Sequence, residues 1–294
     1  MLPFELPPPA GTAVRPIWNG ERFVVGGEAF SVLEYSENFA GWSDDLTRLH
    51  EDVAGDAHPI DLASRHNALS QLKFHLNSRQ APVIMEVGCS SGFLLRDIAK
   101  LYSQGTVIGA DVVKEPLYEL ARKLPEVPLM RFDLTQCPLP SDAFDAIVML
   151  NVLEHIEDDL AAVRQIHRLL KPGGVAVIEV PAGPQLYDAY DKELMHFRRY
   201  SMDELCRRLE QAGLQVTRKT HLGFLLYPAF SYVKRRNQHL SPAEAEGKSL
   251  VEKQAAATSA SSLVGYLFDI ESYFSKWFSY PTGIRCLVTC KKSN

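Results

Sequence analysis

The chain has 294 residues, of which 46% are hydrophobic and 23% are charged, and its net charge at pH 7 is −5. This composition is typical of a globular protein large enough for one substantial core or two smaller ones. The acidic balance argues against nucleic acid as a partner, since nucleic-acid binding normally requires a basic face. The five cysteines are scattered and form no CxxC pair, which favours reduced thiols in the cytoplasm over a zinc site or a disulfide framework.

Residues 1–82 are predicted to form an N-terminal cap or lid in front of the main domain. The proline-rich start lacks the basic and apolar parts of a signal peptide, and no apolar run reaches the roughly 18 residues that span a bilayer. Residues 22–35 should form a small hairpin around Gly26 and Gly27. Leucines at near-helical spacing predict an amphipathic helix over residues 61–76.

Between residues 83 and 221, short apolar runs alternate with helical patterns, which is typical of βαβ units around a parallel sheet covered on both faces. Asp158 should begin one helix, and Ser201 with Glu204 forms a capping box for another that Gly213 should end. The strands are expected at residues 83–88, 106–111, 128–133, 144–150, 174–180, 214–220 and 284–292. The predicted fold is therefore α/β: a Rossmann-like, doubly wound, mostly parallel seven-stranded sheet.

Residues 222–282 interrupt this order as a mainly helical insertion before the last strand of the core sheet, residues 283–294. The insertion begins apolar, turns basic, continues as a polar linker and then carries aromatic residues at helical spacing. We interpret it as a cap over an acceptor pocket. A surface for a protein partner, including a homodimer, is the second interpretation, and a membrane contact is the third.

The stretch VIMEVGCSSGFLL, residues 83–95, is typical of a nucleotide-binding turn, because glycine after a buried strand lets a ligand approach the backbone. A dinucleotide fingerprint that starts at Gly88 would need further glycines where Ser90 and Phe93 stand. The acids Glu86 and Asp111 instead favour a nucleoside without a diphosphate, because an acid at the second strand end can accept hydrogen bonds from both ribose hydroxyls.

Several motifs resemble those of the class I S-adenosylmethionine-dependent methyltransferases. The first is MEVGCSSGFLL, the second VIGADVV, the third and fourth RFDLTQCPLPSDAFDAIVMLNVLEHIED, and the fifth-strand signature LLKPGGVAVIEVP. The resemblance extends from about residue 83 to residue 213. It implies S-adenosylmethionine as cofactor, S-adenosylhomocysteine as product, and no metal.

The resemblance also implies roles for individual residues around the cofactor. The methionine part would be surrounded by Glu86, Gly88, Cys89, Ser90 and Gly92, the ribose and adenine edge by Asp111 and Val112, the adenine by Asp133 and Leu134, and the sulfonium by Asn151 and Val152. Serine at position 90 departs from the glycine common in the family. The N-terminal lid would add Tyr35, Trp42 and Arg65, the last for the methionine carboxylate.

The acceptor side is expected after the fourth and fifth core strands. His155 is the first candidate for a base, one helical turn past Asn151, and His196 is the second. A structural role, in which His155 orders its loop by hydrogen bonding to Glu154 or Asp158, is an equal alternative. The candidates for acceptor binding are Tyr190, His196, Arg198, Arg199 and Tyr200. The two arginines could clamp an acceptor anion or pair with neighbouring acids.

These observations favour methyl transfer to a small or medium metabolite, with oxygen preferred because a histidine base is most useful for a hydroxyl or carboxyl group. The alternatives are an NAD(P)-dependent oxidoreductase and a non-catalytic protein that binds S-adenosylmethionine. A nucleic-acid methyltransferase is disfavoured because NVLE stands where an NPPY-type motif would follow the fourth strand.

Overall fold

The computed structural model of the protein describes residues 1–36, 56, 58–238, 262–275 and 277–293. Its centre is an eight-stranded sheet with the order β10-β11-β9-β8-β5-β6-β7-β4. The strands are β4 (Val32–Glu34), β5 (Val83–Val87), β6 (Thr106–Asp111), β7 (Leu129–Arg131), β8 (Phe144–Leu150), β9 (Leu170–Pro181), β10 (Leu214–Leu222) and β11 (Arg285–Lys292). Strand β11 runs antiparallel to both of its neighbours, and the strands from β9 to β4 are parallel.

The sheet confirms the predicted fold class, with one strand more than the seven expected. The additional strand is β4, in which Val32 and Leu33 pair with Leu129 and Met130 of β7 and are almost fully buried. The predicted hairpin is present as β2 (Phe23–Val25) and β3 (Glu28–Phe30), and Gly26 and Gly27 supply the positive φ of its turn. A further strand, β1 (Ile17–Trp18), pairs with β2.

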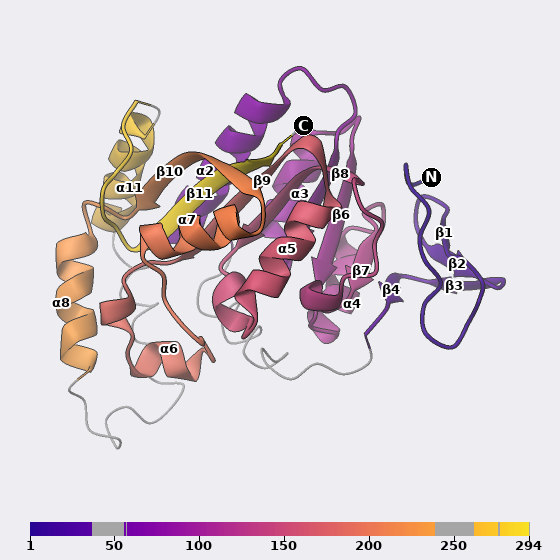
Figure 1. Ribbon diagram of the computed structural model, residues 1–294, viewed down its shortest axis with the longest axis horizontal. Helices are drawn as coiled ribbons and strands as arrows, with labels where there is room; N and C mark the ends of the chain where they lie inside the picture. Colours follow the sequence, from indigo (N-terminus) through magenta and orange to yellow (C-terminus); the bar gives the residue numbers. More distant parts are fainter. Residues whose placement is uncertain (37–55, 57, 239–261, 276, 294) are drawn as a thin grey trace.

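Helices cover both faces of the sheet (Figure 1). One face carries α2 (Pro59–Leu76), α3 (Phe93–Leu101) and α4 (Glu115–Lys123), and the other carries α5 (Asp159–Leu169) and α7 (Met202–Gln211). Alternate residues of β8 enter the two cores: Ile147 packs on the α5 side and Val148 on the α3 side. This double burial explains why the strands are continuous apolar runs.

The helix ends follow the capping chemistry of the sequence. The Asp158 carboxylate accepts a hydrogen bond from the Ala161 amide (2.9 Å), and the Ser201 hydroxyl accepts one from the Glu204 amide (3.2 Å). Gly213 ends α7 with a φ of 88°. These boundaries fix the loops at the carboxyl ends of β8 and β9.

The described parts of the insertion, α8 (Tyr227–Asn237) and α11 (Ser262–Phe274), lie at the end of the molecule opposite β1–β3 (Figure 1). Phe268 of α11 packs against Ala63 of α2 and against Leu222. Helix α8 contacts the segment after β9, which contains η3 (Pro184–Leu186) and α6 (Ala189–Glu193). None of the helices in the described ranges is both long and apolar enough to cross a membrane.

Candidate functional site

The turn between β5 and α3 requires glycine at two positions. Gly88 and Gly92 have φ values of 75° and 76°. A Cβ atom on Gly88 would lie 2.1 Å from Cγ2 of Val152, and one on Gly92 would lie 2.3 Å from Cδ1 of Leu120. The first turn therefore lies directly against the loop after β8, so two of the predicted cofactor segments meet at the carboxyl ends of adjacent strands.

Asp111 joins the turn to the end of β6. Its Oδ2 accepts a hydrogen bond from the Ser90 amide (2.8 Å), and its Oδ1 accepts one from the Val112 amide (2.7 Å). Ser90 adopts a left-handed φ of 39°, a conformation that costs a non-glycine residue free energy. The carboxylate is thus held at the strand end from which an acid reaches the ribose hydroxyls of a nucleoside in this kind of fold.

Glu86 is a buried carboxylate whose Oε2 makes no hydrogen bond within the described part of the chain. Burial raises the pKa of Glu86 well above its usual value, the charges of Asp111 and Asp97 raise it further, and Arg65 opposes them. An unpaired buried carboxylate oxygen is costly unless a ligand satisfies it. An ammonium group would do so, and S-adenosylmethionine carries one on its methionine part.

Of the three predicted lid residues, the structure places one beside the glycine turn. Arg65 pairs with Asp56 (2.7 Å) and Asp97 (3.6 Å) and lies over the Phe93 ring, with 5.6 Å between its guanidinium carbon and the ring centroid. The Tyr35 hydroxyl instead donates to the Pro7 carbonyl (2.9 Å), which ties it to the N-terminal segment. Trp42 lies outside the described residues.

The residues predicted to contact the adenine lie just after β7. The Asp133 Oδ1 accepts hydrogen bonds from the amide and the hydroxyl of Thr135, both 2.8 Å, and Leu134 is buried. The Asp133 amide donates to the Ser36 hydroxyl (3.1 Å). The sequence analysis missed Ser36, because its place depends on the pairing of β4 with β7. The Cys89 thiol points into the core beside Gly109, so this residue can offer a ligand only its backbone.

Asn151 connects the ends of β8 and β9. It has a φ of 53°, and its amide donates to the Glu179 carbonyl (2.8 Å) while Nδ2 donates to Glu179 Oε1 (3.2 Å). The same Oε1 accepts from the Ser64 hydroxyl (2.7 Å) and from Arg285 (3.0 Å). Burial raises the pKa of Glu179. No sequence pattern indicated Glu179, Ser64 or Arg285, which come from three distant segments.

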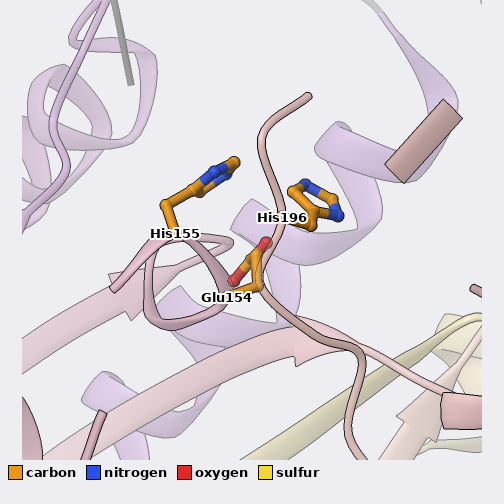
Figure 2. A group of neighbouring side chains, drawn as sticks. All are labelled: Glu154, His155 and His196. Carbon is orange, nitrogen blue, oxygen red and sulfur yellow. The ribbon is translucent and has the colours of Figure 1, made fainter. Parts of the chain in front are cut away.

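Glu154, His155 and His196 form a compact cluster past the end of β8 (Figure 2). The first two belong to η2 (Leu153–His155), and the third belongs to the loop after α6. The imidazole centroids are 4.6 Å apart, with an angle of 72° between the rings. Glu154 is 1% exposed, and burial raises its pKa to about 8. The structure thus brings the two predicted catalytic histidines together and adds a glutamate.

A buried charge cluster holds the loop that carries His196. Asp191 accepts hydrogen bonds from His196 Nδ1 (2.9 Å), from Arg199 Nε (2.8 Å) and from Lys234 Nζ (3.1 Å). Lys234 of α8 also contacts Asp188 (2.7 Å). Burial acts to raise the pKa of Asp191, but the hydrogen bond from His196 and the charges of Lys234 and Arg199 outweigh it and lower the pKa.

The other residues predicted to bind the acceptor make hydrogen bonds and ion pairs within the protein itself. Arg198 pairs with Asp159 (2.8 Å), and the fully buried Tyr200 donates its hydroxyl to the same carboxylate (2.9 Å). Arg199 contacts Asp191 and the Ala182 carbonyl, so this arginine pairs with a neighbouring acid, which was the alternative to a clamp for an acceptor anion. The Tyr190 ring lies 4.6 Å from Lys234 Nζ, and burial raises the pKa of Tyr190 to about 12.

A doubly wound sheet with acids at the ends of adjacent parallel strands is an arrangement that suits a nucleoside ligand. The family model described as a methyltransferase domain matches residues 85–178. A "probable S-adenosylmethionine-dependent methyltransferase" of Mycolicibacterium smegmatis is 30% identical over 138 residues, which are 45% of this chain and 52% of the relative. A ubiquinone biosynthesis O-methyltransferase of Actinobacillus pleuropneumoniae is 31% identical over 134 residues, 42% and 56% of the two chains.

A phosphoethanolamine N-methyltransferase 2 from Haemonchus contortus, solved with phosphomonomethylethanolamine and S-adenosylhomocysteine, has a similar fold. Its TM-score is 0.55 at 14% identity, over 84% of this chain and 57% of that one. The resemblance that the motifs indicated is therefore confirmed: residues 85–178 match the methyltransferase-domain family, and curated relatives over this part of the chain are described as S-adenosylmethionine-dependent methyltransferases. The chain spans about half the length of the curated relatives that it matches.

Proposed function

We propose that the protein is an S-adenosylmethionine-dependent methyltransferase that acts on a small or medium metabolite, with oxygen as the preferred acceptor atom. The observation that carries the proposal is the pair Glu86 and Asp111 around the glycine turn. One acid offers a buried, unpaired oxygen that suits the methionine ammonium, and the other lies at the strand end that suits the ribose hydroxyls.

We propose the remaining cofactor contacts at the same edge of the sheet. Gly88 and Gly92 let the ligand approach the backbone of the turn, where Cys89 and Ser90 offer backbone groups. Val112, Asp133 and Leu134 would line the adenine, and Asn151 and Val152 would line the sulfonium. Arg65, with Tyr35 and Trp42 from the N-terminal segment, would belong to a lid over the methionine end.

Methyl transfer from a sulfonium is an in-line displacement. The bond from the methyl carbon to sulfur breaks as the bond to the acceptor oxygen forms, and sulfur keeps the electron pair. The acceptor hydroxyl must also lose a proton. Most of the acceleration can come from holding donor and acceptor in line in a pocket that excludes water.

We assign the acceptor side to the loops that carry His155 and His196, the catalytic candidates. Both imidazoles lie past the end of β8, in the same region as the sulfonium contacts Asn151 and Val152. Tyr190 would contribute to acceptor binding, while Arg198, Arg199 and Tyr200 position the loop through their buried pairs. The O-methyltransferase named among the relatives supports an oxygen acceptor.

The insertion, residues 222–282, would close this acceptor region as a cap. Its helix α8 contacts Asp191 of α6, which hydrogen-bonds to His196, through Lys234, and α11 packs against α2. In this division, residues 1–82 form the lid, residues 83–221 the methyltransferase core and residues 283–294 its last strand. A homodimer that uses the insertion would compete with this arrangement and would be detected as concentration-dependent sedimentation.

Calorimetric titration of the full chain with S-adenosylhomocysteine tests the cofactor assignment. We expect saturable one-site binding, a loss of at least about 100-fold in affinity for Asp111→Asn, and native affinity for the control Asp269→Asn, an exposed aspartate of α11. Absence of heat with the native protein, confirmed by equilibrium dialysis, would refute the proposal. Saturable binding of NADH in its place would favour the oxidoreductase alternative.

A further inference from the structure

The Glu154, His155 and His196 cluster contains the side-chain types that bind first-row transition metals in proteins. Each residue offers one ligand atom, and the three atoms lie within 4.8 Å of one another. Two imidazoles and one carboxylate form the set found in open facial metal sites, where the remaining coordination positions are available to a substrate. Glu154 and His196 are buried and His155 is half-buried, so the cluster is not a solvated surface group.

A second observation points to a cation independently of the spacing. The Glu154 Oε2 is buried and has no hydrogen-bond partner in the ranges that the structure describes. Figure 2 shows the Glu154 carboxylate below the gap between the two imidazole rings. An unsatisfied buried carboxylate oxygen beside two imidazoles is unfavourable in an empty site and becomes favourable once a cation binds.

The orientation of His196 is typical of a metal ligand. Its Nδ1 hydrogen-bonds to Asp191 at 2.9 Å. Because a carboxylate accepts this bond, the neutral imidazole carries its proton on Nδ1, and the lone pair of Nε2 is available to a cation. Histidines that bind metals usually make such a bond to a carboxylate through their other nitrogen. Arg199 and Lys234 fix Asp191 in turn. The loop is thus built to hold one nitrogen of His196 in place.

We infer that Glu154, His155 and His196 bind a divalent transition-metal cation on the acceptor side of the site, with open positions for an acceptor oxygen. Imidazole ligands favour zinc, iron, cobalt or nickel over magnesium and calcium, which prefer oxygen ligands alone. Bonds of about 2.1 Å would place neighbouring ligand atoms about 3 Å apart, so the three side chains would close on the cation by small rotamer changes.

The role of the cation rests on the proposed function, whereas the binding site does not. A hydroxyl bound to a divalent cation releases its proton to solvent more easily, and the resulting oxygen anion attacks the methyl carbon. As this oxygen–carbon bond forms, the carbon–sulfur bond breaks, and the sulfonium sulfur keeps the electron pair and leaves as the neutral thioether. The family resemblance implied no metal, and no sequence spacing pointed to this cluster, because His196 lies on a different loop from Glu154 and His155.

Zinc binding to the full, tag-free chain tests the site. After chelator treatment and dialysis, titration with Zn²⁺ in a competing chelator should give one site per chain. We expect His196→Gln, His155→Gln and Glu154→Gln each to weaken binding by at least about 100-fold, and Asp191→Asn by about 10- to 100-fold. The controls are the exposed His66→Gln and Glu126→Gln, which should bind as the native protein does. All five cysteines are buried, which limits competition from thiols.

Circular dichroism and S-adenosylhomocysteine affinity separate this inference from the proposed function. Variants that stay folded, keep native nucleoside affinity and lose zinc support the site. Zinc binding that the three substitutions leave unchanged, or no saturable binding by the native chain, would overturn it without affecting the cofactor assignment. Zinc binding with no affinity for S-adenosylhomocysteine would refute the proposed function and leave the site intact.

The open positions have their own test. Co²⁺ bound at the cluster should show visible absorption bands that shift when catechol, a probe with two hydroxyl oxygens, is added. Co²⁺ in the Glu154→Gln protein should show neither the native bands nor the shift. Native Co²⁺ bands that catechol leaves unchanged would mean a closed structural site and would overturn the role in acceptor binding.

Discussion

Ser90 carries backbone strain that the family resemblance makes understandable. A serine at φ 39° occupies the left-handed region, which costs a non-glycine residue about 1–2 kcal/mol. Its amide hydrogen bond to Asp111 does not depend on the side chain. The glycine that the family resemblance implies at this position would therefore fit this backbone as well.

Ser90→Gly should leave the free energy of unfolding unchanged or raise it by up to about 1 kcal/mol, since relief of strain exceeds the entropy that glycine adds to the unfolded chain. Affinity for S-adenosylhomocysteine should stay within about threefold of native. Ser90→Val, a β-branched residue at the same φ, should lower stability by about 1 kcal/mol or more. Urea denaturation measures both variants, and a Gly variant less stable than the Val variant would contradict this explanation.

Glu86 is the residue where stability and cofactor binding should oppose each other. The pKa of Glu86 is raised in the folded state, so a protonated Glu86 carboxyl favours folding. This contribution to stability is lost as the pH rises from the pKa of the unfolded state through the pKa of the folded state. Without cofactor, Glu86→Gln should match the native protein near pH 4.5 and become the more stable of the two toward pH 8. The same variant should bind S-adenosylmethionine more weakly.

Parallel urea denaturations at the two pH values, with and without cofactor, check this prediction. A native protein that stays more stable than Glu86→Gln at pH 8 without cofactor would show that the buried carboxylate has a partner in the fold.

Among the secondary-structure elements, the start of β8 is fixed by one carboxylate. Asp145 is nearly buried, pairs with Arg79 and with Lys171 (2.8 Å), and accepts a hydrogen bond from the Val83 amide of β5 (2.8 Å). Burial acts to raise the pKa of Asp145, but the hydrogen bonds from Lys171 and Val83 and the charges of Lys171 and Arg79 lower it overall. One side chain therefore links the starts of β5, β8 and β9.

Asp145→Asn should reduce the free energy of unfolding by about 1–3 kcal/mol, less than for a fully buried pair because solvent screens the partly exposed cations. The lowered pKa means that this stabilisation is present above pH 4 and is lost as pH falls through the folded pKa. The control is Asp142→Asn, whose pair with Lys292 is exposed and should cost less than about 0.5 kcal/mol. Equal losses in the two variants at pH 7 would contradict the prediction.

The elements that the sequence predicted well are those whose signals are local. The Gly26-Gly27 turn, the capping residue Ser201 and the apolar strand at residues 83–87 each depend on a few neighbouring residues. Strand β4 has only three residues, and its burial depends on pairing with β7 almost a hundred residues later. No periodicity can be measured over three residues, so the eighth strand was not predictable.

Across the whole molecule, the difference between local signals and long-range contacts also separates the proposed cofactor side of the site from the proposed acceptor side. Glu86 and Asp111 lie at the carboxyl ends of adjacent parallel strands, so topology alone brings them together. The contacts of Glu179 with Ser64 and Arg285, and of Asp191 with Lys234, join segments far apart in the chain. Sequence spacing therefore indicated the cofactor side more completely than the acceptor side.

Lys234 shows how the insertion is attached to the core. Its side chain is 2% exposed and contacts Asp188 and Asp191, while its ammonium lies 4.6 Å from the Tyr190 ring centroid. Burial lowers the pKa of Lys234, and the two carboxylates act against that change. Removing the cation leaves both carboxylates buried with less compensation, a loss that typically costs about 3–5 kcal/mol.

Lys234→Met keeps the apolar stem and removes only this charge. We expect α8 and residues 184–196 to lose hydrogen-exchange protection by at least about 100-fold, while β5, β6 and β8 keep theirs. The reason is that the contacts of Lys234 with Asp188 and Asp191 join the insertion to residues 184–196 and not to the central sheet. The exposed Arg235→Met is the control on the same helix. Uniform loss of protection across the sheet would instead mean that the insertion and the core unfold as one unit.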